Sequence, residues 1–389
     1  MKRERWFILP LILLCLFLYA RRAHGATVSA ASCSSSDVQV AINSASSGDT
    51  VVVPGGACAW SATVTIPNSK GITLSGGGKT AITGTLDLTP NASASTRVTG
   101  FTFHSVNNAL LTHGSPTTTT FRVDHNVFDG GGIMIVFDGN APGLFDHNTV
   151  STTSAAAEML HNVGLGPSNA AGWADDIIPG GPNMLFIEDN TFTSNASAFG
   201  GTSAIQNYYG ARVVFRHNTL NFCQFDAHGH YPYIGTRWWE IYENTFFVPA
   251  SANQSSLIYV WGGTGVIFNN HVTGGPNTGL GNIFVYNDGP GPYPNLYQIG
   301  RGVNQNYSPT YIWGNDAAIP VTSGSLYVQP GRDYLVSTTQ PSTLLRQELT
   351  SDSSSTIYQY KPYTYPHPLQ AGNSASTPSP PTGLAAVVR

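Results

Sequence analysis

A six-residue pattern recurs along the middle of the chain: an apolar residue, two mostly polar residues, an asparagine, any residue and a second apolar residue. It occurs six times, at 123–128, 145–150, 187–192, 215–220, 241–246 and 267–272. Successive asparagines are 22, 42, 28, 26 and 26 residues apart, so the second interval holds either two turns of a repeat or one turn with a long insertion. Weaker copies lie at 98–103 and 312–315.

The pattern predicts short strands joined by sharp turns. Asparagine tolerates left-handed φ angles and bonds its own backbone, and stacked asparagines can also bond one another. Apolar residues at every second position on both sides of the turn point into an interior that one repeat alone could not bury. We therefore expect a β-solenoid in which the asparagines of the repeats align in one column, namely Asn126, Asn148, Asn190, Asn218, Asn244 and Asn270.

With this ladder and its entry segments, 37–43 followed by 48–54, the chain resembles the right-handed parallel β-helix proteins of the pectate-lyase-like superfamily over about residues 36–330. Segments 331–334 and 363–369 are similar to a closing element of a bacterial, largely uncharacterised secreted branch. The resemblance implies an all-β, right-handed parallel β-helix whose residues 37–43 form an N-terminal capping helix. It says almost nothing about chemistry, because the superfamily includes lyases, hydrolases, esterases, epimerases, phage spikes and adhesins.

The ends of the chain differ in composition from its middle. Residues 1–25 combine a basic head, an apolar run of 15 residues and a small-residue site, which predicts a signal peptide, with an uncleaved anchor as the alternative. Residues 26–370 are expected to form the β-helix domain, with a cap at about 33–58 and a closing element at about 331–370 over the last turn. Residues 371–389 have linker composition and end like the first strand of a fibronectin type III-like module.

Composition narrows the class of partner. Charged residues make up only 10% of the chain, whereas 18 Phe, 18 Tyr and 7 Trp exceed what a disordered chain carries. The signal peptide holds five of the 17 basic residues and one of the 21 acidic ones, so the mature chain has a net charge of −8. We therefore expect no nucleic-acid partner, and no membrane partner after signal cleavage.

Cysteine use agrees with export. Cys15 would leave with the signal peptide, whereas Cys33 and Cys58 flank one short N-terminal unit and are expected to form a disulfide worth about 3 kcal/mol. Cys223 is the odd cysteine and is expected to be buried. The protein is thus predicted to be secreted, extracellular or periplasmic, and we expect a monomer.

The superfamily resemblance places the substrate groove on the strand before each ladder strand. Counting back from each asparagine puts these strands near 158–162, 204–208, 224–230, 257–261 and 283–288. Asp226, His228 and His230 occupy alternate positions and hence one face of a strand. That face should point outward, because burying the trio would cost several kcal/mol.

These residues suggest uronate elimination, which needs a base, a group that neutralises the carboxylate and an acid for the leaving oxygen. We assign His228, Arg237 and Tyr259 to those roles, beside Asp226, and expect Asp226, His228 and Arg237 to be solvent-accessible. Substrate-binding candidates are the neighbouring groove residues and the wall formed by the 163–183 insertion, namely His161, Asn207, His230, Trp261, Asp175 and Asp176.

Other interpretations of the same residues stay open. Asp226, His228 and His230 could form a surface hydrogen-bonded patch or a two-histidine, one-aspartate metal site. Glu188 beside Arg216 suggests a solvated ion pair. No calcium-binding cluster of carboxylates is evident, so no metal is assigned and the cofactor is left unknown, with calcium a possibility.

The chain departs from known enzymes of the superfamily. It lacks a lysine near the groove centre, which several lyase families use, and the Arg-x-Lys of polygalacturonase-like hydrolases. We predict a polysaccharide lyase acting on an acidic, uronate-containing glycan. The alternatives are a glycoside hydrolase or esterase using the same groove, and a non-catalytic glycan-binding or cell-surface structural protein.

Overall fold

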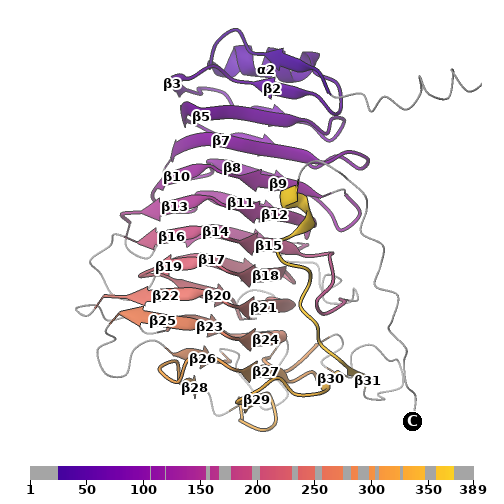
Figure 1. Ribbon diagram of the computed structural model, residues 1–389, viewed down its shortest axis with the longest axis vertical. Coiled ribbons are helices and arrows are strands. Elements are labelled where there is room, and N and C mark those ends of the chain that lie inside the picture. The colour runs from indigo at the N-terminus through magenta and orange to yellow at the C-terminus, as the bar shows by residue number, and fades with distance from the viewer. Residues whose placement is uncertain are drawn as a thin grey trace, which may run out of the picture.

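Short parallel strands stack into coils from one end of the molecule to the other (Figure 1). The computed structural model describes residues 25–105, 107–118, 120–154, 158–165, 177–194, 202–229, 235–249, 256–274, 282–287, 298–302, 306–324, 327–346 and 356–371. The fold is a parallel β-solenoid, as the repeat predicted. None of the helices in these residues is long and apolar enough to cross a membrane.

One end of the solenoid is closed by strand β1 (Thr27–Ser29) and helix α2 (Ser35–Ser44). The Ser34 side chain caps the helix by accepting a hydrogen bond from the Asp37 backbone N–H, and the helix buries Val38, Ala41 and Ile42. This confirms the predicted capping helix. Cys33 and Cys58 are bonded, with Cα atoms 5.9 Å apart, so the predicted disulfide is also confirmed.

A ten-stranded parallel sheet forms one face of the solenoid, and we call it the front sheet. It comprises β4 (Val64–Ile66), β6 (Leu86–Leu88), β8 (Leu110–His113), β11 (Ile135–Asp138), β14 (Glu158–Val163), β17 (Ser203–Tyr208), β20 (Gln224–Ala227), β23 (Ile258–Val260), β26 (Ile283–Val285) and β28 (Val321–Ser323). Counting back from the asparagines located β14, β17, β20, β23 and β26 correctly.

The other strands form a 19-stranded sheet in which β1, β2 (Thr50–Val52), β3 (Gly56–Ala59), β5 (Thr73–Thr83) and β7 (Thr96–Ser105) lead into two columns. The first column holds β9 (Phe121–Asp124), β12 (Gly143–Asp146), β15 (Leu185–Glu188), β18 (Arg212–Arg216), β21 (Trp238–Tyr242), β24 (Thr264–Phe268), β27 (Thr310–Trp313) and β29 (Tyr334–Ser337). The second holds β10 (Val127–Gly130), β13 (Thr149–Thr152), β16 (Thr191–Ser194), β19 (Thr219–Asn221), β22 (Thr245–Val248) and β25 (His271–Gly274).

The ladder asparagines align between these two columns, as predicted. Each backbone N–H donates to the Oδ1 atom of the asparagine on the next coil, at 2.9–3.2 Å, from Asn126 as far as Asn315. Asn148 bonds directly to Asn190 at 2.9 Å. The 42-residue interval is therefore one coil with a long insertion.

The turn itself corrects one part of the sequence argument. The left-handed φ belongs to the residue before each asparagine, for example His125 at 55°, His217 at 54° and Glu243 at 54°. The asparagine instead uses its side chain to bond the backbone of its own and neighbouring coils, as Asn126 Nδ2 does with the Asp124 carbonyl oxygen at 2.9 Å. The amide, rather than tolerance of left-handed φ, explains asparagine at this position.

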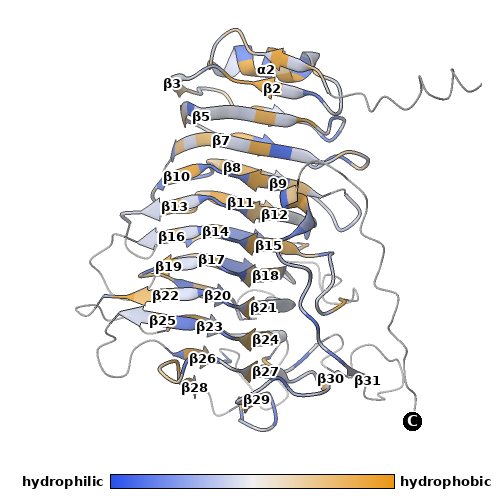
Figure 2. Cartoon of the chain, viewed as in Figure 1, coloured by the Kyte–Doolittle hydropathy of each residue, from blue (hydrophilic) through white to orange (hydrophobic). Residues whose placement is uncertain are grey.

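Apolar residues alternate with polar ones along the strands and fill the interior. The alternation is visible along β7, where hydrophobic and hydrophilic positions follow one another (Figure 2). Trp239 belongs to the main core, and Trp238, on the other side of the same strand, belongs to a second apolar cluster outside the first column.

That second cluster is covered by the C-terminal strap, which we define as residues 356–371. After β30 (Leu344–Arg346) pairs with β31 (Thr356–Tyr358), the strap runs back along the first column to a 3-10 helix at Pro368–Ala371 (Figure 1). Arg216 donates to the Tyr363 carbonyl oxygen at 2.7 Å, and Arg122 donates to that of Leu369 at 3.1 Å. Residues 363–369 therefore cover the flank of the solenoid rather than its last turn.

The strap also explains the state of the Glu188–Arg216 pair. Arg216 Nε donates to Glu188 Oε2 at 2.6 Å, and both side chains are completely buried. The expectation of a solvated ion pair was wrong, because the sequence pattern of the repeats does not reveal that a distant segment packs over them.

Candidate functional site

The outer surface of the front sheet carries two columns of side chains set by the strand register. One column runs through His161, Gln206, Asp226, Tyr259 and Phe284, which are paired across β14, β17, β20, β23 and β26. The second lies two residues further along each coil. It comprises Val163, Tyr208, His228, Trp261 and Tyr286.

Rings on these two columns form a continuous strip. His228 lies between Tyr208 and Trp261, with ring centroids at 4.5 and 4.6 Å and both pairs stacked. Trp261 is 4.5 Å from Tyr259, whose ring in turn lies 5.1 Å from that of Phe284. We call this set the ring strip; its members are His161, Tyr208, His228, Trp261, Tyr259, Phe284 and Tyr286.

The end of the strip nearer the cap is polar. His161 Nε2 hydrogen-bonds to Glu158 Oε2, and both side chains are partly exposed. The Tyr208 ring stands edge-on to His161 at 5.2 Å, and its hydroxyl donates to Gln206 Oε1. The carboxylate-held imidazole of His161 thus lies next to the phenol of Tyr208, which in turn stacks on a second imidazole, that of His228.

Burial controls the charge of His228. Its enclosure between two rings lowers the pKa of its imidazole, an effect larger than the opposing influence of the Gly229 carbonyl and Glu158. Nδ1 lies 3.4 Å from the Gly229 carbonyl oxygen. At neutral pH His228 is therefore uncharged and able to accept a proton.

Several predicted site residues are in or beside this surface, but not all are accessible. His228, Tyr259, Trp261 and His161 are half-buried on the outer face. Asp226 faces outward between the core residues Phe225 and Ala227, yet only 2% of it is exposed. The expectation that Asp226 is solvent-accessible was wrong.

Arg237 and Asn207 require larger corrections. Arg237 precedes β21 and is 0% exposed, so it does not present its guanidinium to solvent as expected. Asn207 points into the solenoid, where it accepts from Asn162 Nδ2 at 2.9 Å and donates to the Asp226 carbonyl oxygen at 2.8 Å. It belongs to a short internal amide ladder, because its strand position has the parity of the core residues.

Three other predicted residues, His230, Asp175 and Asp176, lie outside the described residues. Five further residues of this surface were not predicted as site residues from the sequence, namely Glu158, Gln206, Tyr208, Phe284 and Tyr286. Gln206, Tyr208, Phe284 and Tyr286 lie on or directly after strands that counting back had located, and outward parity together with aromatic or hydrogen-bonding character is the signal that would have found them. Glu158 shares the parity of the core residue Leu160, so the alternation would not have found it.

The part of the chain that the structure describes contains no group of three or more His, Cys, Asp or Glu side chains arranged to hold a metal ion. His113 comes nearest on the front sheet, with imidazole nitrogens 3.8 and 3.6 Å from Asp87 and Asp138 carboxylate oxygens. No residue is assigned to a metal here.

Comparison with known proteins gives likenesses in structure only. No protein-family model and no curated protein matches the chain. An alginate lyase from Paenibacillus sp. str. FPU-7 is 16% identical with a TM-score of 0.43, over 80% of this chain and 95% of that one.

Two more solved structures are similar at this level. The alginate lyase AlyF-OU02, in complex with G6, is 14% identical with a TM-score of 0.42, over 75% of this chain and 73% of its own. A variant of the PL6-family alginate lyase AlyGC is 12% identical with a TM-score of 0.40, over 87% of this chain and 57% of its own.

Proposed function

We propose that the protein is a secreted parallel β-helix protein of the pectate-lyase-like type that binds an acidic polysaccharide along the ring strip and cleaves it by β-elimination. The observation that carries the proposal is the ring strip. Sugars present apolar faces that aromatic rings cover, while polar groups fix their orientation. The strip extends over five neighbouring strands, about 19 Å at the usual strand spacing, which suits a polymer rather than a single sugar.

The polar end of the strip supplies the groups that elimination needs. His228 is uncharged at neutral pH and would take the proton from C5 of a uronate at Nε2. As the C4–O bond breaks and the C4=C5 double bond forms, Tyr208 would donate its phenolic proton to the leaving oxygen. His161, held by Glu158, would donate to the uronate carboxylate.

This assignment revises the roles first given to Arg237 and Tyr259. Arg237 is buried and is replaced by His161 as the group that contacts the carboxylate. Tyr259 becomes part of the stacking platform, because Tyr208 rather than Tyr259 lies against the His228 ring. Asp226 supports this surface from a buried position. The Cys33–Cys58 disulfide supports export to an oxidising compartment.

A non-catalytic glycan-binding protein is the second candidate. The burial of Asp226 and Arg237 favours it, because it removes from solvent the carboxylate and the guanidinium nearest to His228 in sequence. A retaining or inverting hydrolase needs two facing carboxyl groups. At the polar end of the strip, the described residues offer one partly exposed carboxyl group, that of Glu158, so a hydrolase is less well supported.

The test uses a panel of uronate and neutral polysaccharides with ultraviolet absorbance, reducing-end and gel-retardation assays. His228→Phe keeps the ring stack but cannot accept a proton, so it should lower the elimination rate by about 100-fold or more while retardation persists. Because burial lowers the pKa of His228 below its usual 6.5, most of this imidazole is neutral at pH 6.5, and the wild-type rate should fall as the pH drops below that value. His104→Ala, a half-exposed histidine away from the strip, is the control.

The outcomes separate the candidates. Absorbance that is unchanged in His228→Phe would refute the assigned base. Retardation without cleavage, abolished by Trp261→Ala, would establish the binding protein instead. Reducing ends without ultraviolet absorbance would indicate a hydrolase.

A further inference from the structure

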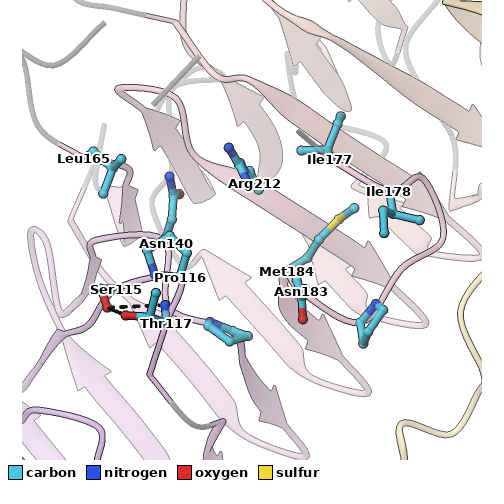
Figure 3. A pocket seen from close by; sticks show the side chains of 12 residues that line it. Ser115, Pro116, Thr117, Asn140, Leu165, Ile177, Ile178, Asn183, Met184 and Arg212 are labelled. Atoms are coloured by element: carbon cyan, nitrogen blue, oxygen red, sulfur yellow. Dashed lines mark hydrogen bonds between the residues drawn. The ribbon is translucent and has the colours of Figure 1, made fainter. Parts of the chain in front are cut away.

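A cavity of about 470 Å³ lies at the corner where the front sheet turns into the first column (Figure 3). Its walls come from the segments that follow β8, β11 and β14, from the start of β18 and from the segment before β15. The volume is within the roughly 300–1,000 Å³ typical of small-molecule sites. No residue of the ring strip lines this cavity.

Most of the lining is aliphatic. Three prolines and four aliphatic or thioether side chains surround the space, namely Pro116, Pro142, Pro182, Leu165, Ile177, Ile178 and Met184. A sugar would leave hydroxyls against these walls without partners, at the cost of desolvation. The cavity therefore suits a compact apolar body rather than a continuation of the glycan site.

Five polar residues also line the cavity, namely Ser115, Thr117, Asn140, Asn183 and Arg212, and two of them, Arg212 and Asn140, come from different coils. Arg212, at the start of β18, is 8% exposed and brings a cationic guanidinium to the lining. Asn140 has a left-handed φ of 57° and is anchored by its Nδ2 atom, which donates to the Gly210 carbonyl oxygen at 3.3 Å. Its Oδ1 atom is shielded from solvent and accepts no hydrogen bond from the described part of the chain.

We propose that this cavity binds a small aromatic hydroxy acid. The aromatic body would fill the space among the prolines and aliphatic side chains. Its carboxylate would pair with the Arg212 guanidinium, a charge-assisted bond that gains strength in a poorly hydrated site. Its hydroxyl would donate to Asn140 Oδ1, the acceptor that the described residues leave without a donor.

The probes are three molecules of matched size: para-hydroxyphenylacetate, phenylacetate without the hydroxyl, and para-hydroxyphenylethanol without the carboxylate. Calorimetry on the full chain should show that the first binds tightest. The ethanol analogue should bind about tenfold or more weakly, because it has lost the charged bond to Arg212. Phenylacetate should bind several-fold more weakly.

Two variants locate the site. Thr117→Trp changes an exposed residue of the lining and should block the cavity with little effect on folding, lowering affinity about tenfold or more. In Asn140→Asp, the aspartate tolerates the same backbone conformation but repels a carboxylate. The substitution should therefore weaken the binding of para-hydroxyphenylacetate more than the binding of the ethanol analogue. Thr63→Trp, at an exposed position away from the cavity, is the control and should bind as wild type.

Failure to bind any of the three probes, or equal affinity for the acid and the ethanol analogue, would overturn the proposal. So would an unchanged affinity in Thr117→Trp. Because the readout is binding at a cavity apart from the ring strip, these outcomes do not depend on whether the protein cleaves a polysaccharide.

Discussion

Each ladder asparagine bonds to several backbone groups as well as to its neighbours in the ladder. Asn218 donates from its backbone N–H to Asn244 Oδ1 at 3.0 Å and from Nδ2 to the Ile187 carbonyl oxygen at 2.9 Å. Its own Oδ1 accepts from the backbone and the side chain of Asn190 at 3.0 and 3.1 Å. One amide therefore connects three successive coils.

Replacing Asn218 by Leu should lower the free energy of unfolding by at least about 1–3 kcal/mol, because buried backbone groups on two coils lose their partners. Urea denaturation followed by circular dichroism measures the effect. Asn68→Leu, at an exposed position outside the ladder, should change stability by less than about 0.5 kcal/mol. Equal effects of the two substitutions would contradict the assigned role of the ladder.

Single residues also show where sequence reasoning is sufficient and where it is not. Outward parity correctly placed Trp261 and Tyr259 on one surface, because period two is a local property of a strand. The inward position of Asn207 follows from the same alternation, since it shares the parity of the core residue Ile205. The burial of Asp226 instead depends on what neighbouring coils and loops place around it. Exposure is therefore a tertiary property that the alternation of residues does not contain.

At the level of elements, the repeat predicted the positions of the strands, whereas the position of the strap could not be deduced from it. The strap has no repeat and contacts strands more than 100 positions away in sequence, as Tyr360 does with Glu240. Glu240 is fully buried and accepts from Tyr360 Oη at 2.6 Å, from the Gly180 N–H at 2.7 Å and from Trp238 Nε1 at 3.0 Å. Burial raises the pKa of the Glu240 carboxyl, whereas these three hydrogen bonds oppose that shift by stabilising the ionised form.

Two tyrosines of the strap form a matched pair that tests this packing. Tyr360→Phe removes a donor from the buried carboxylate and should cost about 1–3 kcal/mol of stability. Tyr365→Phe removes the bond from Tyr365 Oη to Asp189 Oδ1, 2.7 Å long but on an exposed residue, and should cost less than about 0.5 kcal/mol. If urea denaturation gives equal losses, the strap is not held through Glu240.

The whole molecule is a stack in which each coil contacts its neighbours, so stability should be local along the solenoid. The cap end is closed by α2 and by the Cys33–Cys58 bond, which joins residues 25 positions apart. Further along the stack, successive coils are held by the asparagine ladder and the strap instead. The disulfide should therefore stabilise the first coils much more than it stabilises the coil of Asn218.

Removing the disulfide in a Cys33→Ala, Cys58→Ala double variant should destabilise the cap by about 3 kcal/mol through the entropy of the opened loop. Hydrogen exchange should then accelerate in β1 to β4, while amides near Asn218 keep their protection, because local openings do not have to spread through a stack of nearest-neighbour contacts. Cys223→Ala is the control. This buried cysteine lies just before β20, so its replacement should accelerate hydrogen exchange in its own coil. Acceleration by the same factor along the entire chain of the double variant would instead show that the solenoid unfolds as one cooperative unit.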